Sequence, residues 1–117
     1  MRVVFRADAS VTIGTGHVMR CLTLADALRP RGAECRFVTR ALPGHLGAGI
    51  EDRGFDVALL RAPDARAPTG PPDHAAWAGV SWEQDLAETR NAMAAADWLI
   101  VDHYAFDARW QRGLADR

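Results

Sequence analysis

The stretch that decides the fold class is residues 2–28, RVVFRADASVTIGTGHVMRCLTLADAL. Residues 2–6 are rich in valine and phenylalanine and predict a short strand. Residues 7–16 form a polar loop with two glycines. From His17 to Leu28 the apolar residues recur three and four positions apart, which predicts an amphipathic helix. A strand, a loop and a helix in this order are typical of the first unit of an α/β fold.

The same alternation continues along the chain. Further strands are predicted at residues 34–39, 56–60 and 98–101, and further helices at residues 42–53, 82–96 and 106–117. Ser81, with Gln84 three residues later, is typical of a helix N-cap. Residues 98–101 are all apolar, which predicts a strand buried on both faces. The order predicts a Rossmann-like parallel sheet of at least four strands with helices on both faces.

Composition excludes several classes of protein. Of the 117 residues, 49% are apolar and the net charge is −1, so one globular domain is expected. The arginines are spread from Arg2 to Arg117, and no apolar run approaches the roughly 20 residues of a membrane span. Neither nucleic acid nor membrane is therefore an expected partner. Cys21 and Cys35 are expected to be buried free thiols, and with no visible signal peptide the expected location is the cytoplasm.

Two features of the later sequence concern domain organisation. Residues 61–79 form a long loop dense in proline, glycine and alanine, and loops of that length are usually functional or mobile. Trp110 and Leu114 give the last helix an apolar side, yet no further strand or domain follows them. We therefore expect residues 1–117 to be one domain of a longer protein.

Ligands of open α/β sheets bind beyond the carboxyl ends of the strands, where the first loop lies. Gly14 and Gly16 allow a tight turn and close approach to a ligand, and a helix N-terminus favours a phosphate or oxyanion. A dinucleotide fingerprint would need a third glycine where Met19 stands, and a Walker loop would need a lysine, which the chain lacks. His17 at the helix start is expected to be neutral, as a general base must be. The alternative is a capping or surface histidine.

Three other polar residues near this edge each have two interpretations. Arg6 and Asp8 either hold His17 in one tautomer or contact a ligand, or they form a local salt bridge. Arg20, one turn into the helix, either reaches a phosphate or is solvated or paired with a carboxylate. Asp102, at the end of the last strand, is typical of a residue that caps the following turn.

The remaining candidates are aromatic. Trp77 and Trp82 flank the end of the long loop and either stack on a sugar or pack onto the sheet. His45 and His74 lie in loop-like stretches and are expected to be solvated. His103 has no second ligand at metal spacing, so no metal site is expected.

Two separated motifs resemble one enzyme family. Residues 6–20 resemble the opening of the UDP-2,4-diacetamido-2,4,6-trideoxy-β-L-altropyranose hydrolases of pseudaminic acid biosynthesis. The matching positions are Arg6, Ala7, Asp8, Ala9, Ser10, Ile13, Gly14, Gly16, His17 and Arg20. Residues 99–104, an apolar run followed by Asp102, His103 and Tyr104, are similar to a second family motif.

This resemblance implies a two-domain fold of the glycosyltransferase-B type, of which residues 1–117 are the amino-terminal half. It implies hydrolysis of the sugar–UDP bond by water, with inversion at the anomeric carbon and with no metal or cofactor. His17 matches the catalytic base. Arg6, Asp8, Gly14, Gly16, Arg20 and Tyr104 are the candidate substrate-binding residues.

The expected partners are the UDP-sugar and the carboxy-terminal domain of the same enzyme, which supplies most uridine diphosphate contacts in the family. Two alternatives remain open. One is a glycosyltransferase of the same architecture that uses a hydroxyl acceptor in place of water. The other is a non-catalytic binding domain.

Overall fold

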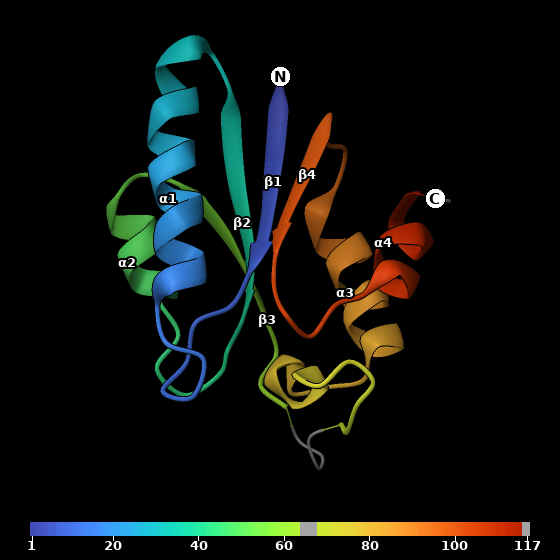
Figure 1. Cartoon of the computed structure of the whole chain (residues 1–117). Helices are drawn as coiled ribbons and strands as arrows, with labels where there is room; N and C mark the ends of the chain where they lie inside the picture. Colours follow the sequence, from blue (N-terminus) through green and yellow to red (C-terminus); the bar gives the residue numbers. More distant parts are fainter. Residues whose placement is uncertain (64–67, 116–117) are drawn as a thin grey trace.

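The computed structural model describes residues 1–63 and 68–115. Its centre is a parallel sheet of four strands in the order β3-β2-β1-β4 (Figure 1). The strands are β1 (Arg2–Ala7), β2 (Glu34–Arg40), β3 (Asp56–Leu60) and β4 (Trp98–Asp102). The prediction of an α/β, Rossmann-like parallel sheet is therefore confirmed.

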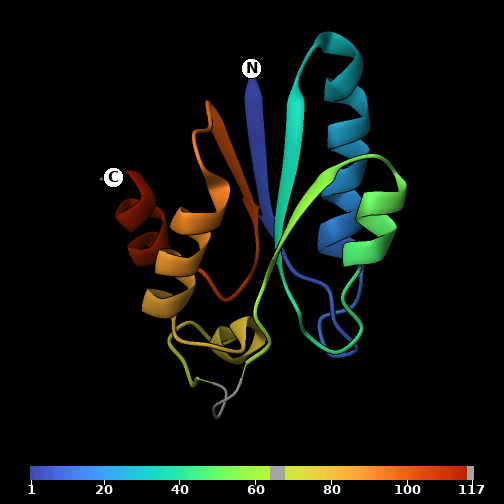
Figure 2. The same cartoon turned by 180° about the vertical axis from the view of Figure 1, so that it is seen from behind.

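Helices cover both faces of this sheet (Figures 1 and 2). One face carries α1 (Gly16–Leu28) and α2 (Gly47–Asp52), and the other carries α3 (Trp82–Met93) and α4 (Ala108–Ala115). Two short 3-10 segments, η1 (Arg29–Arg31) and η2 (Ala75–Ala78), complete the connections. Among the described residues, no helix has the length and apolarity needed to cross a membrane.

The core is divided between the two faces because side chains alternate along β1. Val3 and Phe5 pack beneath α1, where Phe5 stacks on Phe37 at 4.8 Å between ring centroids. Val4 packs on the opposite face with Trp110, which is completely buried. Both cysteines are free, as expected, but only Cys21 is buried, and Cys35 is half-buried. Burial raises the pKa of the Cys21 thiol to about 12.

Two predicted helices are shorter than the sequence indicated. The helix predicted from residue 42 begins only at Gly47, because Gly44 takes a left-handed φ of 87° and the turn at Pro43 bonds to the first loop. The helix predicted to residue 96 ends at Met93, and Ala94 follows with a φ of 54°. The long loop contains η2. Its residues 64–67, and residues 116–117 of the predicted last helix, lie outside the described residues.

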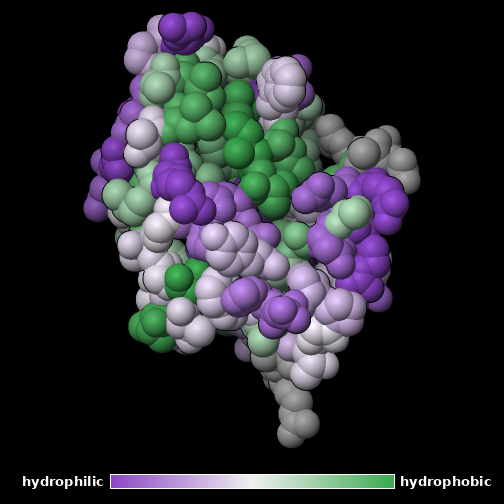
Figure 3. All heavy atoms as spheres, viewed as in Figure 1, coloured by the Kyte–Doolittle hydropathy of each residue, from purple (hydrophilic) through white to green (hydrophobic). Residues whose placement is uncertain are grey.

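The prediction that β4 is buried on both faces is wrong. Within residues 1–63 and 68–115, β4 pairs only with β1 and forms an edge of the sheet. Its first residue, Trp98, is 63% exposed. An apolar hollow of about 310 Å³ lies beside it, and Figure 3 shows apolar surface at the upper ends of α1 and the sheet. The hollow is lined by Met1, Val3, Leu24, Leu28, Trp98 and Ile100.

The predicted N-cap of α3 is confirmed and gives a first test. Ser81 Oγ accepts a hydrogen bond from the Gln84 N–H at 3.1 Å. We expect Ser81→Ala to lower the free energy of unfolding by about 1 kcal/mol. Urea denaturation measures this loss. Thr15→Ala is the matched control, because Thr15 occupies the N-cap of α1 without a side-chain hydrogen bond. Equal losses in both variants would contradict the assignment.

Candidate active site

The adjacent carboxyl ends of β1 and β4 bring a histidine and a carboxylate together. His17 is the second residue of α1, and Asp102 is the last residue of β4. Their side chains meet with Nδ1 of His17 2.5 Å from Oδ1 of Asp102. The His17 side chain is only 9% exposed. This pair lies where open α/β sheets place their ligands.

Arg20, one turn further along α1, holds the same carboxylate. Its Nε and Nη2 each donate to one oxygen of Asp102, both at 2.9 Å, and Nη2 lies 3.2 Å from Nδ1 of His17. Burial raises the pKa of Asp102, but hydrogen bonds from Arg20 and His17 outweigh it and hold that pKa below its usual range. Of the two interpretations of Arg20, the structure therefore places it in the carboxylate pair.

The ionised carboxylate determines which ring nitrogen of His17 carries hydrogen. An unprotonated Nδ1 would point its lone pair at a carboxylate oxygen 2.5 Å away, which is repulsive. We therefore assign the hydrogen to Nδ1, donating to Asp102. Nε2 is then the nitrogen left to accept a proton, as a general base requires.

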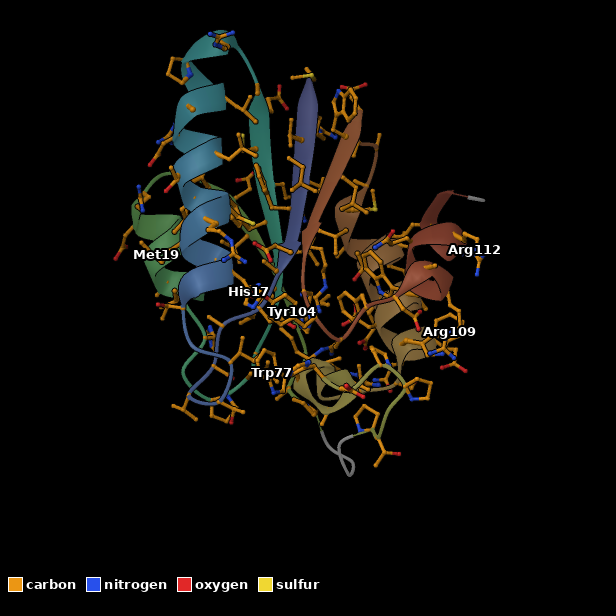
Figure 4. The ribbon with its side chains drawn as sticks, in the orientation of Figure 1. His17, Met19, Trp77, Tyr104, Arg109 and Arg112 are labelled. Carbon is orange, nitrogen blue, oxygen red and sulfur yellow. The ribbon has the colours of Figure 1, made fainter. Side chains whose placement is uncertain are left out.

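Aromatic rings surround His17. Tyr104 packs edge-on against it at 4.8 Å between centroids, and Trp77 does so at 6.5 Å. Trp77 and Tyr104 lie nearly parallel at 6.0 Å, and exposed His74 contacts both. Figure 4 shows His17, Tyr104 and Trp77 together between the start of α1 and η2. We call His17, His74, Trp77 and Tyr104 the aromatic cluster.

The first loop forms a groove next to this cluster. Gly14 has a φ of 83°, and its N–H donates to the Ser10 carbonyl at 2.8 Å, which confirms the tight turn. Gly16 begins α1. The groove has a volume of about 380 Å³ and shares Trp77 with the aromatic cluster. Its lining is mostly apolar and comprises Ser10, Val11, Thr12, Ile13, Leu42, Pro43, Ala76 and Trp77.

Arg6 and Asp8 do not face this site. Both side chains are completely buried and pair at 2.7 Å between Nη1 and Oδ1. Arg6 also pairs with Asp85 of α3 at 2.5 Å, and Asp85 pairs with Arg40 of β2 at 2.8 Å. Arg6 and Asp8 thus form a salt bridge, the second of their two interpretations. This salt bridge is part of an internal network with Asp85. Asp102, and not Asp8, holds His17.

His103 joins this network to the site. Its Nε2 lies 2.8 Å from Oδ2 of Asp8, while its Nδ1 accepts the Ala105 N–H at 3.1 Å. Side chains along residues 102–104 therefore alternate, with His103 directed inward and its neighbours, Asp102 and Tyr104, beside His17. Across residues 1–63 and 68–115, no group of three histidine, cysteine or acidic side chains could hold a metal ion.

The buried network predicts sensitivity to acid. Burial raises the pKa of Asp8, but the charge of Arg6 and the His103 hydrogen bond hold it well below its usual range. The pKa of Asp85 is likewise held low, against burial, by Arg6 and Arg40. Because these folded-state pKa values are depressed, the stabilisation is present above about pH 4 and is lost as the pH falls further. Urea denaturation between pH 6 and pH 2 measures it, and constant stability over that range would contradict it.

No protein-family model matches the chain. No curated protein matches it significantly.

Proposed function

We propose that the chain is the amino-terminal, sugar-facing half of a UDP-sugar hydrolase, acting on a UDP-linked 2,4-diacetamido-2,4,6-trideoxy sugar in pseudaminic acid biosynthesis. The observation that carries this proposal is the His17–Asp102 pair at the carboxyl edge of the sheet. The resemblance of residues 6–20 and 99–104 to that hydrolase family supplies the substrate class.

In the proposed reaction, Nε2 of His17 takes a proton from water while the water oxygen attacks the anomeric carbon. The bond from that carbon to the UDP oxygen breaks, and its electron pair leaves with UDP. Asp102 stabilises the imidazolium that forms, because its carboxylate accepts the hydrogen on Nδ1. The imidazolium then returns its extra proton to solvent. Attack from the side opposite UDP gives inversion.

The hydrolase proposal is tested in a protein that joins this chain to its nucleotide-binding half. UDP release from the nucleotide sugar is measured without any acceptor. Release in water alone supports hydrolysis. Release that requires an added hydroxyl acceptor would favour a glycosyltransferase instead.

For the 117-residue chain alone we expect neither turnover nor tight nucleotide binding, because the proposed uridine contacts lie in the other half. The measurements are UDP release and calorimetry with UDP. Turnover of about 1 s⁻¹ or more would contradict the first expectation. A micromolar dissociation constant, roughly −8 kcal/mol, would contradict the second.

A further inference from the structure

A permanent cation lies beside the candidate base. Arg20 Nη2 is 3.2 Å from Nδ1 of His17, while both oxygens of Asp102 accept hydrogen bonds from the same guanidinium. The Arg20 side chain is 61% exposed, and the described contacts of its head group are with Asp102, His17 and Tyr104. A carboxylate, an imidazole and a guanidinium thus share one hydrogen-bonded cluster.

We propose that Arg20 is a positioning residue that acts through Asp102: its guanidinium fixes the plane of the carboxylate, and the carboxylate holds the hydrogen of the His17 ring on Nδ1. The catalytic meaning of this role rests on the proposed function, but the role itself concerns only the tautomer of His17. Nothing in it requires Arg20 to touch a substrate.

Geometry explains why the neighbour is an arginine. The planar guanidinium donates to both carboxylate oxygens at once and so fixes the plane of Asp102. Oδ1 is thereby held 2.5 Å from Nδ1. A lysine would keep the charge but could not form this fork.

Few other groups around His17 could determine which ring nitrogen carries the hydrogen. Asp102 faces the ring from β4 and Arg20 from α1, and these are its charged contacts among the described residues. Trp77, in η2, and Tyr104, after β4, face it with their rings, and Tyr104 also interacts with Arg20. His74 can titrate, but it contacts Trp77 and Tyr104 rather than His17.

Nitrogen NMR of the His17 ring in the complete 117-residue chain tests the proposal, because it reports both tautomer and protonation. In Arg20→Gln we expect the signature of the Nδ1–H tautomer to weaken, because the plane of Asp102 is no longer fixed. Arg20→Lys, which keeps the charge but not the fork, should weaken it too. Asp102→Asn should weaken it most, since the carboxylate that accepts the Nδ1 hydrogen is removed.

Arg31→Gln is the matched control, because it removes the same charge from an exposed arginine of η1, after the far end of α1. It should leave the His17 signals unchanged. An unchanged tautomer signature in Arg20→Gln would overturn the proposal, as would an equal change in the control. The measurement uses no substrate, so a failure of UDP-sugar hydrolysis would leave its result intact.

Discussion

Replacing His17 with asparagine is expected to lower kcat by about 10²–10⁴ in a protein that joins this chain to the proposed nucleotide-binding half. Asparagine cannot take a proton from water, so the loss should appear in kcat, with KM little changed. The fold should persist, because the side-chain hydrogen bond of His17 is with Asp102 at the carboxyl edge of the sheet, outside the two apolar core clusters. Steady-state kinetics and the melting temperature of the same preparation measure both quantities.

His45→Asn is the matched control for that experiment. His45 lies in the turn before α2, where its Nδ1 accepts the Gly47 N–H at 3.1 Å, and its loss should leave kcat unchanged. A His17 that only caps α1 would give a different result, a stability loss of about 1 kcal/mol at normal kcat. That result would make His17 structural, and Tyr104, the ring nearest to it, would be the next candidate to test.

Asp85→Ala is expected to destabilise the chain by about 3–5 kcal/mol, which is enough to unfold many domains of this size. Oδ2 of Asp85 accepts hydrogen bonds from Arg6 at 2.5 Å and from Arg40 at 2.8 Å, and Oδ1 accepts one from Trp110 at 3.1 Å. Alanine would leave one carboxylate fewer to balance two buried guanidinium groups. Urea denaturation followed by circular dichroism measures the loss.

Asp52→Ala controls for the loss of an aspartate as such. Asp52 ends α2 and is exposed, so its replacement should change stability by no more than about 0.5 kcal/mol. If Asp85→Ala does not fold, Asp85→Asn keeps the size and removes only the charge. Stability of either Asp85 variant close to that of the control would mean that the network contributes little to the fold.

Local signals in the sequence were sufficient for most of the fold. The strand at residues 56–60 and the Ser81 cap have the predicted bounds, because valine and leucine runs and a capping serine act within a few residues. The helix predicted from residue 42 failed because a tertiary hydrogen bond, from the Val11 N–H to the Pro43 carbonyl, supports a turn there. The exposure of Trp98 depends on the position of β4 in the sheet, which local patterns do not contain.

The candidate site was predicted less completely. Strand, loop and helix patterns located His17, but its partner Asp102 lies 85 residues away and was interpreted as a cap. The pairing of β1 with β4 was the missing information. For Arg6 a signal was present in the sequence, since it shares a face of β1 with Val4, two residues before it. That face packs against α3, where Asp85 lies.

The inward direction of His103 has a consequence for laboratory evolution of this chain. Residues 102–104 contribute one side chain to the interior and two to the site, so a backbone shift that accommodates a new partner for Asp8 also displaces Asp102 and Tyr104. Selection for heat tolerance at the interior positions is therefore not independent of selection for activity. Variants around Asp8 should show correlated changes in melting temperature and in the His17 environment, whereas variants on the outer surface of α2 should not.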